Sequence, residues 1–575
     1  MQNNDTLGIK YFPVEALQAR NAKAVPFGTE SEGETQVYRS SLSKNLIAEF
    51  PKIETVHQLL ENSIARYSER PCLGTRYLSN GKWSAYQFKS YRQLAEDRRY
   101  FGSALKSIHR DLVKNDDPWF LGIFAINRYE WVVADMGASA YNIPFVALYD
   151  TLGPDTTEFI LNHADVPIVL TSIDKVSTLL DIASKTKLKV IIVMDMQPID
   201  VGLLNVFVTW GAQKDITVLT LTSVLEIGKK NVIEFTPPTA DDVFCLCYTS
   251  GTTGNPKGAI LTHRNMISTV HAGLIQMEFT PMDVHISYLP LAHIFERMMM
   301  LMTLGNGGSA GFFRGDVALL VEDIGCLSPT IFPSVPRLLN RIYDKIIAGA
   351  VHSGSAVKAA LFNRAVSDKT FHLYQNGSLT HSIWDPLVFN KVKALLGGRV
   401  RLVVSASAPI TGSTLEFLRI ALGCQVLEAY GQTESCGGLT ASWPGDYTVG
   451  HVGNPLCNTE IKLVSVPEMQ YHAKDLKGEI WARGPGVFKG YHKDLAKTKE
   501  TITSDGWLMT GDIGTIDSVG HLSIVDRKKN IFKLSQGEYV APEKVLFIFD
   551  YLAREHFCQI AICCTNLRTW RLVTK

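Results

Sequence analysis

The chain has 575 residues, of which 46% are hydrophobic and 20% are charged. A chain of this length and composition is too long for one hydrophobic core and too apolar for disorder, so we expect two or more packed domains. The 57 Lys and Arg residues nearly balance the 56 Asp and Glu residues, which removes the electrostatic argument for a nucleic-acid binder.

The cysteines and the two ends of the chain bear on its location. The ten cysteines lack the spacing of a disulfide framework or a zinc knuckle, so we expect reduced thiols in a cytoplasmic protein. Residues 1–18 contain neither a secretory signal nor an Arg/Ser-rich import segment, and the final tripeptide VTK is not a peroxisomal signal. Export is therefore not expected.

The most apolar long window covers residues 190–210. It contains Asp195, Pro198 and Asp200 near its middle, and each of these is costly in the core of a bilayer. We therefore expect a buried strand, a loop and a following helix instead of a transmembrane helix. Any membrane contact would be peripheral.

Short apolar, β-branched runs recur along the chain and are separated by segments of helical length. They lie at residues 118–125, 166–172, 188–195, 216–221 and 399–407. This alternation predicts parallel α/β layers. Residues 345–384 have helical spacing, whereas turns recur every few residues from Gly478 onward, which predicts antiparallel β-structure closing the large domain.

The most informative segment is YTSGTTGNPKG at residues 248–258. It combines hydroxyl side chains with glycines, which let backbone N–H groups approach a polyphosphate closely. It is not a Walker A loop, because Lys257 lies between Pro256 and Gly258. We predict a phosphate-binding loop; a solvated Gly/Ser/Thr-rich linker is the alternative. Its expected nucleotide ligands are Thr249, Ser250, Gly251, Thr252, Thr253, Gly254 and Lys257, with Thr249 and Lys257 also catalytic.

With six later motifs, this loop resembles the acyl-adenylate-forming superfamily. The motifs follow in the order of that superfamily: YLPLAHIFER (288–297), SASAPI (405–410), YGQTES (430–435), GEIWARGPGVFKGY (478–491), TGDIG (510–514) and HLSIVDRKKNIFK (521–533). The resemblance covers about residues 51–544. It implies an α/β fold in which a large adenylating domain has parallel α/β layers and a β-barrel-like subdomain, followed by a small α+β lid.

The resemblance also implies roles around ATP. Glu434 is the expected catalytic Mg²⁺ ligand, since hard cations prefer oxygen ligands. Asp512 is expected to accept the ribose hydroxyls, and Arg527 supplies a cationic fork nearby. For either residue alone, a surface salt bridge is the alternative. The expected adenine pocket, with an aromatic face and backbone groups, includes Ala408, Pro409 and Tyr430. Gly431 and Thr433 are further expected nucleotide-binding residues.

Two segments are expected to hold the acyl substrate. His293 lies three residues before Glu296, a spacing that resembles an acid/base pair, but the superfamily places this segment at the acyl and phosphate site. We therefore expect His293 to line the carboxylate pocket, with a core histidine as the alternative. Residues 298–314 are rich in Met, Gly and Phe and predict an apolar tunnel that includes Met298, Gly307 and Gly311, with plain core packing as the alternative.

Residues 505–533, 533–544 and 43–77 resemble the long-chain acyl-CoA synthetase subgroup, especially its fungal members. The implied reaction joins a long-chain fatty acid to CoA at the expense of ATP, through an acyl-AMP intermediate and with Mg²⁺. Implied locations are the cytoplasm and the surface of the endoplasmic reticulum or lipid droplets. Adenylation of another carboxylic acid, such as a very-long-chain or aryl acid, and non-catalytic binding are the alternatives.

The expected domains are an N-terminal extension (1–50), the adenylating domain (51–525) and an incomplete lid (526–575). Lys533 resembles the lysine that the superfamily brings to the site during thioester formation. After Lys544 the resemblance stops, and the late lysine of the lid, which assists adenylation, has no counterpart. We therefore expect impaired adenylation, with a retained intron, a frameshift or a genuine short isoform as explanations.

Overall fold

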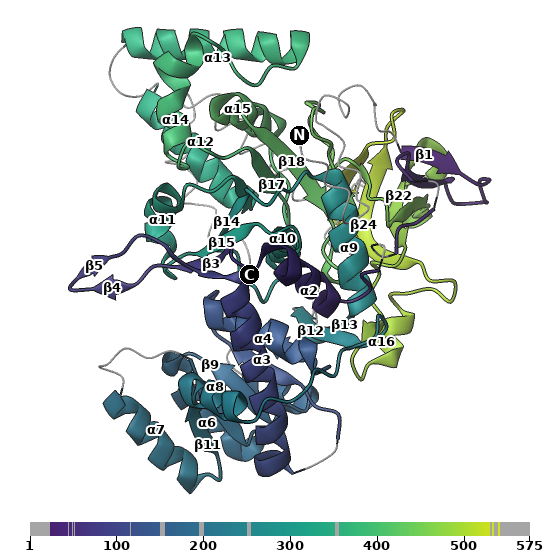
Figure 1. Ribbon diagram of the computed structural model, residues 1–575. Helices are drawn as coiled ribbons and strands as arrows, with labels where there is room; N and C mark the ends of the chain where they lie inside the picture. Colours follow the sequence, from purple (N-terminus) through teal and green to yellow (C-terminus); the bar gives the residue numbers. More distant parts are fainter. Residues whose placement is uncertain are drawn as a thin grey trace, which may run out of the picture.

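The computed structural model describes residues 24–43, 45–48, 50, 52–114, 117–149, 156–194, 201–249, 255–350 and 356–528, together with the backbone of residues 532–533 and 539–540. Three large sheets, two two-stranded sheets and the surrounding helices form the described part of the chain (Figure 1). One of the small sheets is a hairpin of β4 (Leu78–Ser79) and β5 (Lys82–Trp83). The phosphate-loop residues Ser250 to Gly254 lie outside the described residues.

An eight-stranded sheet carries the residues on either side of the predicted phosphate loop. Its spatial order is β11-β10-β9-β7-β8-β12-β13-β23, parallel from β11 to β12 and antiparallel beyond. The strands are β7 (Leu121–Phe124), β8 (Phe145–Ala147), β9 (Ile168–Thr171), β10 (Val190–Val193), β11 (Thr217–Thr220), β12 (Val243–Thr249), β13 (Lys257–Thr262) and β23 (Gly490–Tyr491). Buried apolar runs explain β7, β9 and β10, as parallel strands covered on both faces require.

A nine-stranded sheet is parallel in its centre and has the order β20-β19-β18-β17-β16-β14-β15-β3-β6. Its strands are β3 (Pro71–Thr75), β6 (Gln87–Ser90), β14 (Val284–Ser287), β15 (Ser309–Phe312), β16 (Ile331–Ser334), β17 (Leu402–Ser405), β18 (Gln425–Tyr430), β19 (Thr440–Ala441) and β20 (Asn454–Pro455). The carboxyl ends of its parallel strands meet at one edge, where ligands bind in open α/β sheets.

A third sheet is antiparallel throughout, in the order β1-β2-β21-β22-β24-β25. Its strands are β1 (Ala24–Phe27), β2 (Val37–Ser40), β21 (Glu460–Val464), β22 (Lys477–Arg483), β24 (Leu508–Ile516) and β25 (Leu522–Arg527). The antiparallel structure predicted after Gly478 is thereby confirmed. The described part of the predicted N-terminal extension supplies two of these strands, β1 and β2.

Helices pack against the two large sheets. They include α2 (Val56–Tyr67), α3 (Tyr91–Ile108), α4 (Tyr129–Ala140), α5 (Thr156–His163), α6 (Val176–Ile182), α7 (Val201–Gln213), α8 (Leu221–Lys230), α9 (His263–Gln276), α10 (Ile294–Gly305), α11 (Leu320–Leu327), α12 (Pro336–Ala350), α13 (Ala356–Asn376), α14 (Asn390–Ala394), α15 (Gly412–Leu422) and α16 (Leu495–Lys499). Among the described residues, no helix is both long and apolar enough to cross a membrane.

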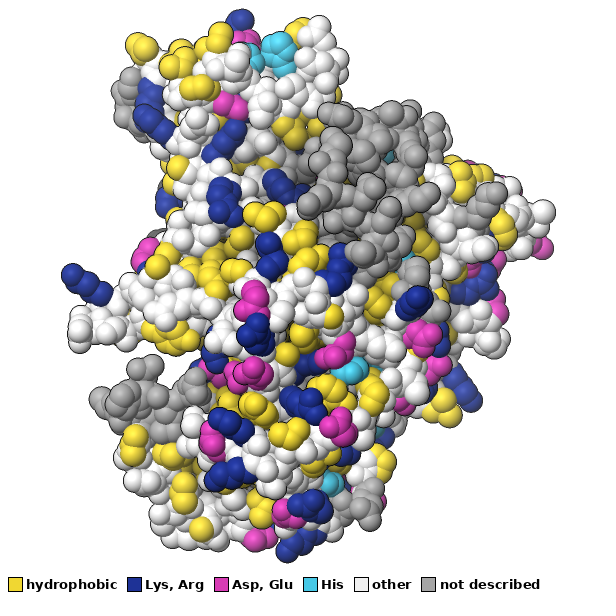
Figure 2. Space-filling view, in the orientation of Figure 1, with side chains coloured by type: hydrophobic (Ala, Val, Ile, Leu, Met, Phe, Trp, Pro, Cys, Tyr) yellow, Lys and Arg dark blue, Asp and Glu magenta, His cyan; other side chains and the backbone are white. Residues whose placement is uncertain are grey.

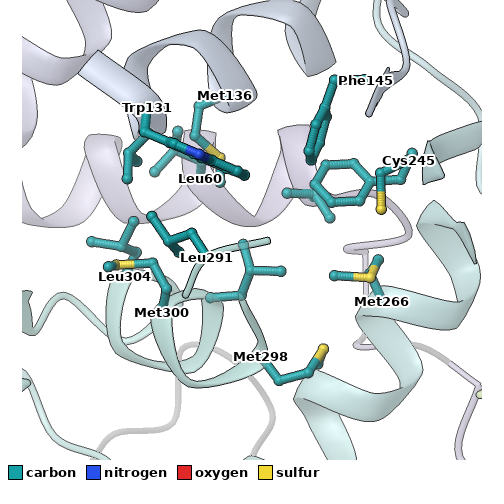
Figure 3. Packing of buried hydrophobic residues seen from close by; sticks show 14 of the residues in the cluster. Leu60, Trp131, Met136, Phe145, Cys245, Met266, Leu291, Met298, Met300 and Leu304 are labelled. Carbon is teal, nitrogen blue, oxygen red and sulfur yellow. The ribbon is translucent and has the colours of Figure 1, made fainter. Parts of the chain in front are cut away.

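Helix α10 runs through the largest hydrophobic core. Nearly all its residues are buried, as expected for a helix that is apolar around most of its circumference. Figure 3 shows Met298, Met300 and Leu304 among core side chains that include Trp131 of α4 and Leu60 of α2. This helix packs on β14 and β15 of the nine-stranded sheet and contacts α2 and α9. Because α9 packs against β13, the contact between α10 and α9 connects the two large sheets.

The predicted parallel strands are all confirmed, as β7, β9, β10, β11 and β17. The window 190–210 contains the buried strand β10 and the helix α7, as predicted, whereas its expected loop at residues 195–200 lies outside the described residues. The helical segment predicted at 345–384 is divided between the end of α12 and α13, which ends at Asn376.

Candidate active site

The two residues that flank the phosphate loop face each other at the end of a hairpin. Thr249 ends β12, Lys257 begins β13, and the two are register partners. Helix α9 follows directly, because Thr262 forms a capping box with Asn265. The Asn265 amide also donates 2.8 Å hydrogen bonds to the backbone oxygens of Pro485 and Val487, which holds the segment before β23 against α9.

Lys257 and Glu434 both contact Tyr491 of β23. The Tyr491 hydroxyl donates a 2.6 Å hydrogen bond to Oε1 of Glu434, and the Lys257 ammonium lies 5.6 Å from the centre of the Tyr491 ring. Burial and the neighbouring Glu434 raise the pKa of Tyr491, so its hydroxyl remains a donor at neutral pH. Two predicted site residues are therefore brought together by a tyrosine that the sequence analysis did not single out.

Glu434 is suited to hold a divalent cation. It lies in a 3₁₀ turn (Thr433–Ser435) directly after β18, and its backbone oxygen accepts a 2.8 Å hydrogen bond from the Phe488 amide. Its second carboxylate oxygen, Oε2, accepts no hydrogen bond from another described residue. Glu434 is half-buried, and a carboxylate oxygen available for coordination fits the preference of Mg²⁺ for hard oxygen ligands.

The predicted nucleotide residues gather where β17 and β18 end. These strands are parallel, with Ser405 opposite Glu428, so the segments that follow them start from one edge of the sheet. Ala408 and Pro409 are exposed after β17, and Tyr430 is the last residue of β18. Gly431 and Thr433 follow directly and are half-buried.

Asp512 and Arg527 are also neighbours, as the sequence analysis predicted. They are register partners in β24 and β25, with 3.7 Å between Nε of Arg527 and Oδ1 of Asp512. Oδ2 of Asp512 accepts a 2.7 Å hydrogen bond from the Tyr430 hydroxyl and a 2.8 Å hydrogen bond from the Gln432 amide. Burial raises the pKa of Asp512 despite these donors. Gln432 was missed, because only the fold places it opposite Thr510 and Asp512.

His293 lies close to the end of β12. It precedes α10, its ring centre is 5.8 Å from that of Tyr149, and the Tyr149 hydroxyl donates a 2.6 Å hydrogen bond to the Tyr248 oxygen. The imidazole is solvent-accessible, yet desolvation lowers its pKa. The packed residues around the exposed imidazole account for this desolvation. A role in the carboxylate pocket stays a prediction.

Glu296 and Arg297 belong to the core and form no acid/base pair with His293. Nε2 of His285 lies 2.8 Å from Oε1 of Glu296, within hydrogen-bonding distance, and both side chains are fully buried. Arg297 forms a 2.9 Å ion pair with Asp135 and lies over the rings of Trp131 and Phe145. Truncating one partner of such a buried pair is strongly destabilising. A structural role is therefore sufficient to explain why these charged residues are present, and no catalytic role is needed.

Core packing fills the predicted acyl-tunnel segment. Met298 is buried, with its sulfur 3.9 Å from that of Cys436. A Cβ atom on Gly307 would lie 2.3 Å from the Tyr67 ring, and one on Gly311 would lie 2.6 Å from Leu327. These contacts favour the core alternative for Gly307 and Gly311, and the tunnel stays a prediction.

Another cluster with metal-binding side chains lies away from Glu434. Ligand atoms of Asp446, His451 and His521 all lie within 4.8 Å of one another. However, Nδ1 of His451 accepts a hydrogen bond from the Gly453 amide, and Nε2 lies 2.7 Å from the Thr448 hydroxyl. Both ring nitrogens of His451 are therefore engaged.

The predicted catalytic residue Lys533 belongs to a short strand, β26 (Phe532–Lys533), paired with β27 (Tyr539–Val540), and its side chain lies outside the described residues.

Comparison with known proteins identifies the family. Residues 60–492 match the AMP-binding enzyme family. The chain belongs to this family. Long chain acyl-CoA synthetase 7, a peroxisomal protein of Arabidopsis thaliana, is 43% identical over 92% of the chain and 76% of its own length. Long-chain-fatty-acid–CoA ligase 5 of Mus musculus is 43% identical over 89% of the chain and 74% of its own length.

Within this AMP-binding enzyme family, the chain is a member of the long-chain acyl-CoA synthetases. A solved structure confirms the adenylate-forming fold. The adenylation domain of a carboxylate reductase from Mycobacterium chelonae superimposes with a TM-score of 0.72, covering 86% of the chain and 74% of that domain at 23% identity. ATP and CoA are the substrates that membership implies.

Proposed function

We propose that the protein is a long-chain fatty acid–CoA ligase that converts ATP, a fatty acid and CoA into acyl-CoA, AMP and pyrophosphate. The observation that carries this proposal is the identity of about 43% to long-chain acyl-CoA synthetases over most of the chain. The convergence of Lys257, Glu434, Asp512 and Arg527 from separate strands and turns supports it.

The first step forms acyl-AMP. A carboxylate oxygen of the fatty acid attacks the α-phosphorus of ATP, a new P–O bond forms, and the bond to the β-phosphate oxygen breaks to release pyrophosphate. Lys257 supplies positive charge at the loop, while Asp512 orients the ribose through its hydroxyls. Mg²⁺, when bound, would neutralise phosphate charge, and Glu434 is the residue that would hold it.

The second step transfers the acyl group. The CoA thiolate attacks the acyl carbonyl carbon, a C–S bond forms, and the C–O bond to phosphate breaks to release AMP.

His293 is assigned to the carboxylate of the acid, and its lowered pKa keeps the imidazole neutral at pH 7. Lys533 is assigned to this step on the family pattern alone. Peripheral contact with an intracellular membrane belongs to the same proposal, because a long-chain acid resides in lipid.

The test is a panel of carboxylic acids offered to the purified full chain with ATP, Mg²⁺ and CoA. Acyl-CoA is measured by mass spectrometry, and pyrophosphate release is measured in parallel. We expect kcat/KM to increase with the length of the acyl chain, because apolar binding increases by about 0.8 kcal/mol per buried methylene. A preference for an aryl acid, or ATP binding without turnover of any acid, would refute the proposal.

A further inference from the structure

Tyr248, the first residue of the predicted phosphate loop, is buried and held at two points. Its hydroxyl oxygen lies 2.7 Å from Nδ1 of His163, the last residue of α5, and its backbone oxygen accepts a hydrogen bond from the Tyr149 hydroxyl. Tyr248 packs in the core that includes α5 and α6, whereas Cys247 belongs to the core around α10. Because side chains alternate along a strand, Thr249 lies on the Cys247 face. Tyr248 and the expected catalytic residue Thr249 therefore lie on opposite faces of β12.

The contact between Tyr248 and His163 is a hydrogen bond with a defined direction. Burial raises the pKa of Tyr248, so its hydroxyl keeps the proton at neutral pH. Desolvation and the nearby Lys493 lower the pKa of His163, although Asp165 and Asp494 oppose the shift, so the imidazole is neutral. Among the described residues, Nδ1 of His163 is the one acceptor for the hydroxyl, and a buried donor without an acceptor is costly. The hydroxyl therefore donates to Nδ1, and the imidazole proton resides on Nε2.

The second arm of the loop meets the same histidine. Gly258 is the register partner of Tyr248, and a Cβ atom on Gly258 would lie 3.1 Å from the Tyr248 ring, so this ring lies across the hairpin. The Gly258 oxygen accepts a 2.8 Å hydrogen bond from the His492 amide, and Nε2 of His492 lies 3.2 Å from the His163 oxygen. Both arms of the loop are therefore connected to the end of α5.

His163 is itself held in place by its neighbours. Its ring stacks on that of Phe159, one turn earlier in α5, with 5.1 Å between the ring centres. Asp165, two residues further along the chain, forms 2.5 Å ion pairs with Lys187 and Lys493, and Lys493 follows β23. A side chain that its surroundings fix in this way can hold a second side chain at a defined position.

We propose that His163 is a positioning residue for adenylation, which holds the Tyr248 hydroxyl and thereby fixes Thr249 opposite Lys257 for the polyphosphate of ATP. This inference rests on the proposed function, because it assigns Thr249 and Lys257 to ATP. His163 touches no substrate and acts through Tyr248. Misplacement of a binding group by about 1 Å can cost up to roughly a hundredfold in rate, so the anchor matters for the first step. AMP lacks the β- and γ-phosphates, and its binding does not depend on the anchor.

The experiment measures the binding of Mg²⁺-ATP and of AMP to the full chain by isothermal titration calorimetry, without acid or CoA. His163→Leu removes the acceptor and keeps an apolar contact with Phe159, and Tyr248→Phe removes only the hydroxyl. Each should weaken Mg²⁺-ATP binding roughly fivefold, as loss of one neutral hydrogen bond predicts, and leave AMP binding unchanged. His163→Asn should bind Mg²⁺-ATP nearly as the wild type does, because its Oδ1 replaces Nδ1 as the acceptor.

The double variant His163→Leu/Tyr248→Phe tests whether the two residues act as one unit. It should bind Mg²⁺-ATP no more weakly than either single variant, because all three lack the same hydrogen bond. His372→Leu is the matched control and should bind both nucleotides as the wild type does. His372 belongs to α13, at the opposite end of Figure 1 from β9 and β11, where Figure 2 shows histidine side chains at the surface.

Thermal unfolding verifies that each variant is folded; if His163→Leu does not fold, Tyr248→Phe and His163→Asn provide the same comparison. Equal losses of ATP and AMP affinity would indicate a purely structural role and overturn the proposal, as would additive losses in the double variant or wild-type ATP affinity in Tyr248→Phe. The rate of acyl-CoA formation from synthetic acyl-AMP and CoA should be unchanged in Tyr248→Phe. Because calorimetry requires no acid, its outcome is independent of the acid panel, and failure of the two proposals can be distinguished.

Discussion

At the scale of single residues, Tyr491 positions Glu434 through one hydrogen bond. Tyr491→Phe removes the hydroxyl and keeps the ring against Phe488, whose centre lies 4.9 Å away. A hydrogen bond to a charged group contributes about 1.5 kcal/mol, so we expect roughly tenfold weaker ATP binding in the presence of Mg²⁺ and little change without the metal. Isothermal titration calorimetry with and without Mg²⁺ checks this.

Tyr447→Phe is the matched control, because the Tyr447 hydroxyl donates to the Gly377 oxygen and not to a site residue. It should leave both ATP affinities unchanged. Equal weakening of metal-free and metal-dependent binding by Tyr491→Phe would contradict a specific effect on Glu434 and would indicate general loosening of β23.

Glu428 gives a pH-dependent prediction at the same scale. Burial raises its pKa to about 7, and Arg419 opposes the shift only in part. A carboxyl group with a raised folded-state pKa stabilises the fold below its unfolded pKa and loses that contribution as pH rises towards 7. Glu428→Gln cannot ionise and so does not lose stability in this way. Its free energy of unfolding relative to the wild type should therefore increase between pH 5 and pH 8, by up to about 3 kcal/mol, and its relative melting temperature should rise accordingly. A difference that stays constant with pH would refute the shift.

At the scale of elements, the turn after α10 depends on Gly307. This residue has φ of +76°, and its missing Cβ leaves room for the Tyr67 ring. Gly307→Ala should therefore cost about 1 to 3 kcal/mol, because it combines backbone strain with a steric clash. Gly325→Ala on α11 is the control, because no atom lies within 4 Å of its added Cβ. Calorimetry should show a lower melting temperature for the first variant alone, and an altered chain-length preference with unchanged stability would favour the tunnel instead.

Several elements could be predicted from the sequence because their signals are local. The apolar runs of β7, β9 and β10 and the glycine-rich turn before Lys257 are visible in short windows. The contacts of Tyr491 and Gln432 could not be predicted, because they depend on which distant strands pair. The exposure of α7 was equally hidden, since an apolar run predicts burial until the fold shows that only Phe207 and Gly211 face β11.

At the scale of the whole molecule, two hydrogen bonds connect the three sheets at the candidate site. Tyr491 of the eight-stranded sheet donates to Glu434, which follows β18 of the nine-stranded sheet. Tyr430 of β18 donates to Asp512 of the antiparallel sheet. A nucleotide bound at this junction would contact parts of all three sheets, so its binding energy should stabilise them together.

We therefore expect Mg²⁺-ATP to raise the melting temperature of the whole described fold in one cooperative step. At a concentration a hundred times Kd, the ligand contributes about 2.7 kcal/mol.

Glu434→Ala should weaken Mg²⁺-ATP binding by about 2 kcal/mol and leave stabilisation by AMP unchanged, because AMP lacks the β- and γ-phosphates. Asp512→Asn, which keeps an oxygen for Tyr430 and Gln432, should weaken stabilisation by both nucleotides, since both carry the ribose. Differential scanning calorimetry of the two variants with each nucleotide separates these effects. If Glu434→Ala reduced stabilisation by AMP as much as by ATP, the assignment of Glu434 to the metal and polyphosphate would be wrong.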